Sequence, residues 1–146
     1  MLDTNVVLDL LHFDDPVARP IRHALEAGRV RCVASETTLD EWRRVLAYPE
    51  FGLGPARQAE LFARYQALSE KAGVDDASIG LPHNGTPMPR CSDPDDQKFL
   101  ELAAGGRAQA LVSKDRALLK LRRRCASQFR IMTPAEAVRW VGALPA

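Results

Sequence analysis

Short apolar runs alternate with amphipathic helical stretches along this chain, and this alternation constrains its fold more than any other feature. We expect strands at 30–34, 108–113 and 129–132, and the tail of a strand at Leu2-Asp3. Helices are expected at 5–11, 16–27, 36–48, 55–72, 93–104, 114–124 and 134–140. Strands that alternate with helices favour a parallel sheet covered by helices on both faces. The sequence therefore predicts the α/β class.

The length and composition indicate one globular domain. A chain of 146 residues is long enough for one core and too short for two domains of ordinary size. It has no apolar run that could cross a bilayer and no signal-peptide pattern, so we expect a cytoplasmic protein that does not enter a membrane. Cys32, Cys91 and Cys125 are an odd number without metal-ligand spacing, and we expect free thiols.

Two segments leave alternatives open. Only Met1 and Leu2 precede Asp3, which is short for a central strand, so the natural start could lie upstream of Met1 or the strand could be clipped. The segment 74–90 is rich in Gly, Pro, Asp and Asn and is typical of a connecting loop. A third, edge strand could lie within it.

Four acidic residues occupy equivalent ends of the expected elements. Asp3 and Asp115 follow strands, whereas Glu41 and Asp96 lie near the starts of helices. In a right-handed β-α-β arrangement, strand carboxyl ends and helix amino ends share one edge of the sheet. Open α/β sheets bind their ligands at that edge, so we expect these four side chains to meet there.

Carboxylates that gather without cations repel one another, and their pKa values rise. A hard divalent cation with oxygen ligands relieves this repulsion. Asn5 and Ser113 stand beside two of the acids and could orient their carboxylates by hydrogen bonds. The pattern predicts a metal-dependent site that acts on phosphates.

Each acid also has a local explanation. Asp3 could cap the following helix, and Asp115 could interact with a helix dipole. Asp96 could form a capping box with Asp93, and Glu41 could be a solvated helix residue. The coincidence of four acids at one edge favours the metal site.

A basic cluster lies near the carboxyl end of the chain, although the formal net charge is only +1. Such a local stripe can bind phosphates in a nearly neutral protein. Alternatively, Arg122 to Arg124 merely end a helix, where cations suit the dipole. The cluster consists of Lys114, Arg116, Lys120, Arg122, Arg123, Arg124 and Arg130.

Four short motifs, in this order, resemble those of PIN-domain nucleases. They are Leu-Asp-Thr-Asn at 2–5, the segment 35–46 with Glu41, Asp93-Pro94-Asp95-Asp96 through Ala103, and Leu111 through Asp115 to Leu119. The resemblance covers almost the whole chain, and the spacing is similar to that of the toxin-type, VapC-like branch.

This resemblance implies a three-layer α/β/α fold with a parallel sheet of about five strands, formed by a single domain over residues 1–146. It implies Mg²⁺ or Mn²⁺ held by Asp3, Glu41, Asp96 and Asp115, and hydrolysis of single-stranded RNA, with the basic cluster holding phosphates. Asp93 or Asp95 could replace Asp96 as a ligand. The resemblance also implies a homodimer and a small antitoxin partner.

Two other functions fit parts of the sequence. A phosphate-handling receiver-like switch would use an acidic pocket with Lys114, but its acidic pair belongs after the first strand, whereas the doublet Asp95-Asp96 lies late. A non-catalytic PIN-like domain would bind RNA or a protein without cleavage.

Overall fold

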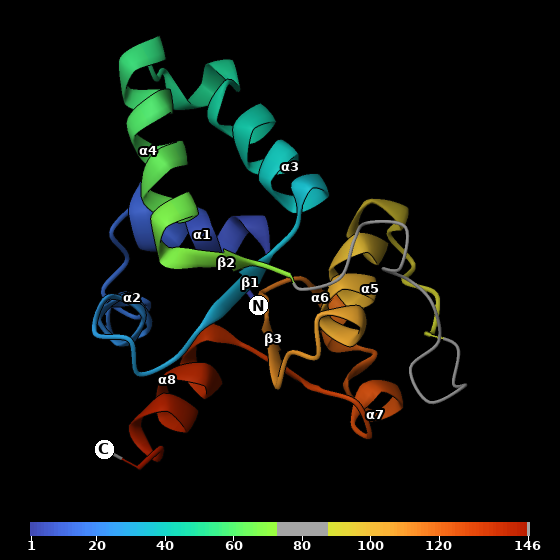
Figure 1. Cartoon of the computed structure of the whole chain (residues 1–146). Helices are drawn as coiled ribbons and strands as arrows, with labels where there is room; N and C mark the ends of the chain where they lie inside the picture. The colour runs from blue at the N-terminus through green and yellow to red at the C-terminus, as the bar shows by residue number, and fades with distance from the viewer. Residues whose placement is uncertain (73–87, 146) are drawn as a thin grey trace.

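A computed structural model describes residues 1–72 and 88–145 of the chain (Figure 1). In this part, β1 (Cys32–Ala34) pairs in parallel with β2 (Ser69–Lys71), and β3 (Ala110–Val112) pairs in parallel with β4 (Arg130–Met132). Leu2 adds an isolated parallel bridge to Val112. The expected parallel pairing is confirmed. The five-stranded sheet stays a prediction, and most of the segment in which an edge strand was expected lies outside the described residues.

Helices connect these strands in the expected order. Capping boxes at Ser35 and Thr133 start two of the helices, because a hydroxyl accepts from the N3 amide while the N3 side chain bonds back. The α-helices are α1 (Thr4–Leu11), α2 (Arg19–Glu26), α3 (Glu36–Leu46), α4 (Pro55–Leu68), α5 (Gln97–Gly105), α6 (Arg116–Leu119), α7 (Arg122–Cys125) and α8 (Pro134–Gly142), and the 3₁₀ turns are η1 (Pro49–Phe51) and η2 (Pro94–Asp96).

Two hydrophobic clusters lie on opposite faces of β3. Leu111 belongs to a cluster with Phe99 and Leu118 from α5 and α6. Its neighbours Ala110 and Val112 belong to another cluster, which includes residues of α1, α3 and α4. Because successive strand residues point to opposite faces, helices cover both faces of this strand. The α/β class is therefore the observed architecture.

The bounds of the predicted helices differ from the structure, and the helix expected over 16–27 spans only Arg19–Glu26. Three further differences change the type or continuity of an element. The expected helix over 55–72 was wrong at its end: α4 stops at Leu68, and 69–71 form β2. The Ser69 hydroxyl donates to the Tyr65 carbonyl at 2.8 Å and satisfies an acceptor at the helix end, while the backbone turns extended. The expected helix over 114–124 is interrupted, because α6 ends at Leu119 and α7 begins at Arg122. The helix expected from residue 93 begins as the 3₁₀ turn η2.

The expectation of free cysteines is confirmed for Cys32, Cys91 and Cys125, which are all buried and unpaired. Across residues 1–72 and 88–145, every helix is too short or too polar to cross a bilayer.

Candidate metal centre

Asp3 and Asp115 both cap helices, as the local explanation of Asp3 predicted, whereas Asp115 was expected within the first turn of its helix and not at the cap. The Asp3 carboxylate accepts from the Val6 amide at 3.0 Å at the start of α1, and the Asp115 carboxylate accepts from the Ala117 amide at 2.8 Å at the start of α6. The Asp3 amide also donates to the Val112 carbonyl at 3.1 Å. Capping thus fixes one oxygen of each carboxylate.

Ser113 connects these two acids. Its hydroxyl donates a hydrogen bond to the second carboxylate oxygen of Asp3, and the same hydroxyl accepts from the Asp115 amide at 2.9 Å. Ser113 is completely buried and Asp3 is 4 % exposed. Ser113, the residue that follows β3, therefore holds Asp3 and Asp115 close to each other.

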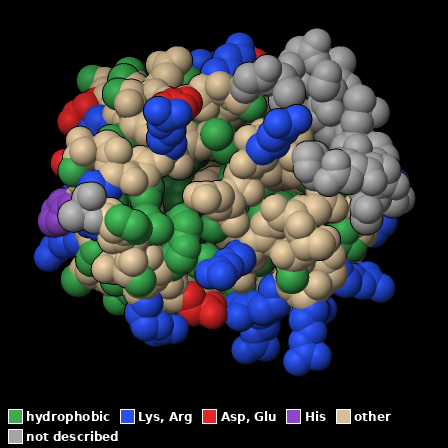
Figure 2. All heavy atoms as spheres, turned by 60° about the horizontal axis from the view of Figure 1, so that its bottom comes forward, with side chains coloured by type: hydrophobic (Ala, Val, Ile, Leu, Met, Phe, Trp, Pro, Cys, Tyr) green, Lys and Arg blue, Asp and Glu red, His purple; other side chains and the backbone are tan. Residues whose placement is uncertain are grey.

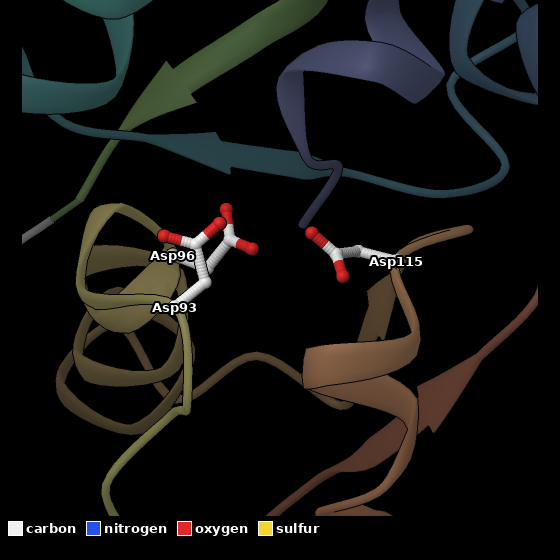
Figure 3. Close-up of side chains that lie close together, drawn as sticks. All are labelled: Asp93, Asp96 and Asp115. Atoms are coloured by element: carbon white, nitrogen blue, oxygen red, sulfur yellow. The ribbon is translucent and has the colours of Figure 1, made fainter.

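An acidic cluster lies at this edge of the sheet. One carboxylate oxygen from each of Asp93, Asp96 and Asp115 lies within 4.8 Å of the others, and Figure 3 shows these side chains directed toward a common space from the η2 turn and the start of α6. Oδ2 of Asp96 is buried and has no hydrogen-bond partner. Carboxylate oxygens at this spacing, together with a buried and unpartnered oxygen on Asp96, suit a cation that prefers oxygen ligands.

Burial and mutual repulsion shift the pKa values of the carboxyl groups at this edge. Burial, then hydrogen bonding and repulsion from Asp115, raise the pKa of Asp96 to about 8. The hydrogen bond with Asp96 lowers the pKa of Asp115, so Asp96 is the carboxyl of this pair that takes up a proton first as the pH falls. Burial raises the pKa of Asp3 to about 6, although the hydrogen bond from Ser113 opposes this shift. A cation would replace the proton that the metal-free cluster retains.

Glu41 lies apart from the three clustered aspartates and has its own partners. Its carboxylate accepts from the Thr4 hydroxyl and forms an ion pair with Lys98 Nζ at 2.8 Å. Lys98 Nζ also donates to the Asp95 carbonyl at 2.6 Å. Lys98 lies in the first turn of α5, two residues after Asp96. Its ammonium group therefore links Glu41 of α3 to the start of α5.

Several residues near the acidic cluster make contacts that the sequence did not predict. Asp93 caps η2 by accepting from the Asp95 amide at 3.0 Å and still contributes an oxygen to the cluster, whereas the capping box expected between Asp93 and Asp96 was wrong. Asn5 is exposed, and it forms no side-chain hydrogen bond within the described residues. Thr4 and Lys98 were missed, because only the packing of α3 against α1 and α5 brings them to Glu41.

Two members of the basic cluster pair with carboxylates. Lys114 Nζ lies 2.6 Å from Oδ2 of the buried Asp9, and Arg122 binds both oxygens of Glu136 at 3.1 and 3.2 Å. Arg116, at the start of α6, directly follows Asp115. Arg123 and Arg124 lie in α7, after the chain has run back from the acidic edge, and Figure 2 shows Lys and Arg side chains gathered along one side of the visible face.

Comparison with known proteins gives one result about the family. A family model described as "PIN domain" matches residues 1–117 of the chain. No curated protein matches, and no solved structure matches.

Proposed function

The chain belongs to the PIN domain family, whose members are generally nucleases that use divalent metals, and we propose that it is a Mg²⁺- or Mn²⁺-dependent endoribonuclease that cleaves single-stranded RNA. The observation that carries the proposal is the cluster of Asp93, Asp96 and Asp115 with its buried, unpaired oxygen of Asp96. That oxygen has no hydrogen-bond partner among the described residues, which supports its use as a ligand for a cation.

In this proposal Asp96 and Asp115 are direct ligands, and Asp93 is a third carboxylate that the geometry adds. Asp3 is held beside them by Ser113 and completes the negative environment. A bound ion would lower the pKa of a water molecule and neutralise charge on the scissile phosphate. Glu41 would orient water or join the ligands after release from Lys98. Asn5 is exposed in the first turn of α1, and we assign it no ligand role.

RNA phosphates would contact the exposed basic side chains that do not pair with a described carboxylate. Arg116 directly follows a proposed ligand, and Lys120, Arg123, Arg124 and Arg130 are exposed and can extend the contact along the chain of phosphates. Lys114 and Arg122 are engaged by carboxylates, so we assign them a smaller share of RNA binding.

The biological setting is proposed from the same family membership. We infer that the protein is the toxin of a toxin–antitoxin pair, acts in the cytoplasm, forms a homodimer and is neutralised by a small antitoxin protein. Coexpression with the product of a neighbouring small reading frame tests this setting: a stable complex that blocks RNA cleavage is the expected result.

Cleavage of a fluorescent single-stranded RNA in Mn²⁺ tests the enzymatic proposal. EDTA should abolish cleavage, and Asp96→Asn and Asp115→Asn should each lower the rate at least about a hundredfold, since each removes a charged ligand. Asp95→Asn is the matched control, because Asp95 is exposed and lies outside the cluster. Equal cleavage by the Asp96 and Asp95 variants would refute the assignment.

A second candidate is a non-catalytic PIN domain that binds RNA or a protein partner. It is favoured by the ion pair between Lys98 and Glu41, because a resident lysine can neutralise one of the acids without a metal. This candidate predicts RNA binding that persists in EDTA, together with no cleavage in Mg²⁺ or Mn²⁺.

A further inference from the structure

A hollow of about 420 Å³ lies beside β4, between α7 and α8. Figure 1 shows the chain passing from α7 along this strand to α8 (orange to red). Arg123 lines the hollow from α7, Ile131 lines it from β4, and Arg139 and Trp140 line it from α8. The family model matches residues 1–117, so every described residue that lines this hollow lies after the matched span.

One edge of β4 has no strand partner among the described residues. The Arg130 amide donates to the Gln109 carbonyl at 3.0 Å. The Met132 carbonyl accepts from the Ser113 amide at 2.9 Å. The backbone groups of Arg130 and Met132 therefore face β3, and because alternate residues of a strand direct these groups to opposite edges, those of Ile131 face away from β3. Since β3 is the only described strand that pairs with β4, one donor and one acceptor stay without a strand partner at this edge.

The charges around the hollow have a positive excess. Glu136 is the only acid among the described residues that line it, and Arg122 binds both of its carboxylate oxygens at 3.1 and 3.2 Å. The other three arginines of the lining are exposed and have no carboxylate partner in residues 1–72 and 88–145. They are Arg123, Arg130 and Arg139. Guanidinium groups gathered in this way attract phosphates or carboxylates.

Trp140 adds an aromatic surface to these charges. It lines the hollow and is only half-buried. Proteins that hold single-stranded nucleic acids combine basic grooves, which follow the phosphates, with aromatic rings, on which the bases stack. An acidic peptide would satisfy the arginines without requiring an indole, whereas a nucleotide offers a flat base together with its phosphates. The hollow therefore suits a nucleotide better than a peptide.

We propose that this hollow is a subsite for one nucleotide of a single-stranded RNA, apart from the phosphodiester that is cleaved. The base stacks on Trp140 and forms hydrogen bonds with the amide and carbonyl of Ile131. The phosphates on its two sides bind Arg123 and Arg139. Because stacking tolerates any base, the subsite positions the strand and does not select a sequence. Its role rests on the proposed ribonuclease function, because the same RNA would occupy it, whereas binding itself requires no metal ion.

β4 connects this subsite with the acidic cluster. The strand ends at Met132, whose carbonyl accepts from the Ser113 amide, and Ser113 contacts both Asp3 and Asp115. Arg130, at the other end of the strand, is exposed. Three residues of a strand span roughly 10 Å, so an RNA strand that leaves the acidic cluster can reach the hollow within a few nucleotides.

Binding of a short RNA in EDTA tests the subsite without cleavage. Oligo(A) of about seven nucleotides should bind the parent and quench the tryptophan emission, which reports Trp140 because Trp42 is only 1 % exposed. Trp140→Leu should weaken binding at least about fivefold, since it removes the stacking of one base. Trp140→Phe keeps an aromatic ring and should lose less.

An exposed arginine provides a variant that does not disturb the core. Arg139→Met should weaken RNA binding at least about threefold, and the slope of log K against log salt should become shallower by about 0.7, as one phosphate contact is lost. The matched control is Arg44→Met, which removes the same charge from an exposed position on α3 and should bind RNA like the parent.

Cleavage in Mn²⁺ separates the subsite from the metal centre. Arg139→Met should raise KM for RNA and leave kcat nearly unchanged, whereas Asp96→Asn should slow cleavage without weakening RNA binding in EDTA. If the parent binds RNA through Trp140 and Arg139 but does not cleave it, the ribonuclease proposal fails and the RNA-binding site stands.

Three results would overturn the subsite itself. The first is that the parent does not bind the oligonucleotide at millimolar concentration. The second is that Arg139→Met and Trp140→Leu bind it as tightly as Arg44→Met does. The third is that an acidic peptide, oligoglutamate, quenches Trp140 as strongly as the RNA does, which would assign the hollow to a protein partner.

Discussion

The hydroxyl of Ser113 donates a hydrogen bond to the carboxylate of Asp3, which lies 110 positions earlier in the sequence. Because the same hydroxyl accepts from the amide of Asp115, one buried serine fixes the relation between two of the proposed site acids. The acidic cluster is therefore supported by the sheet itself, at the end of β3, and not by surface side chains.

We expect Ser113→Ala to destabilise the protein by about 1–3 kcal/mol, since it leaves one oxygen of the buried Asp3 carboxylate and the part-buried Asp115 amide without a partner. Chemical denaturation without metal measures this change. Ser92→Ala, at an exposed position next to the acidic segment, is the control and should be nearly neutral. Equal stability of the two variants would mean that Ser113 does not hold Asp3 in solution.

The stability of the metal-free protein should fall as the pH rises from 4 to 8.5. The folded state raises the pKa of Asp96 to about 8 and that of Asp3 to about 6, above the usual value for both. The folded state thus holds protons that the unfolded chain releases, so this stabilisation is present below pH 4 and is lost as the pH passes through the raised values. Melting temperatures measured in EDTA across this range test the sign.

The variant Asp96→Asn identifies the source of this pH dependence. It cannot ionise, so its melting temperature should vary less between pH 6 and 8.5, and at pH 8.5 it should exceed that of the parent by roughly 3 °C. Asp95→Asn should follow the parent at every pH. Parallel curves for the parent and the Asp96 variant would contradict the raised pKa.

Replacement of Lys98 should strengthen the response to metal. Lys98→Met removes the cation paired with Glu41, which costs about 1 kcal/mol of stability without metal and adds one uncompensated negative charge near the cluster. The rise in melting temperature with Mn²⁺ should therefore be larger than in the parent. Lys120→Met, at an exposed position, is the control, and an equal Mn²⁺ response in both variants would place Glu41 outside the reach of the ion.

Variants at Lys114 and Arg116 should affect different properties, stability in the first case and RNA binding in the second. Lys114→Met leaves the buried Asp9 without its ion pair and should cost about 1.5–3 kcal/mol of stability. Arg116→Met should leave stability unchanged but weaken RNA binding, and the slope of log K against log salt should become shallower by about 0.7, as expected for one lost phosphate contact on a single strand. Filter binding over a salt series measures this slope, and an unchanged slope would show that Arg116 does not contact RNA.

Much of the fold could be predicted from local patterns. Ser35 and Thr133 start helices as capping residues, and an aspartate that directly follows an apolar run marks the end of a strand. The strand Ser69–Lys71 could not be predicted this way. Its residues are polar, and only pairing with β1 makes them extended, so its conformation depends on a contact that helical spacing cannot reveal.

The candidate site shows the same division. That Asp3 and Asp115 share an edge follows from strand direction alone, because parallel strands end on the same side. The role of Asp93 could not be predicted, since a residue that caps a turn with one oxygen can still present the other. The pairing of Glu41 with Lys98 depends on how α3 packs against α5, and nothing local to either residue encodes it.

The amino-acid sequence alone determined the α/β class, the parallel direction of the strands and the edge at which the acids gather, because these follow from short-range periodicity and from the handedness of the chain. Only the tertiary structure decided which carboxylates lie within reach of one another and which of them pairs with a lysine. Those outcomes depend on distances of a few ångströms between elements, and such distances are set by packing of the whole chain.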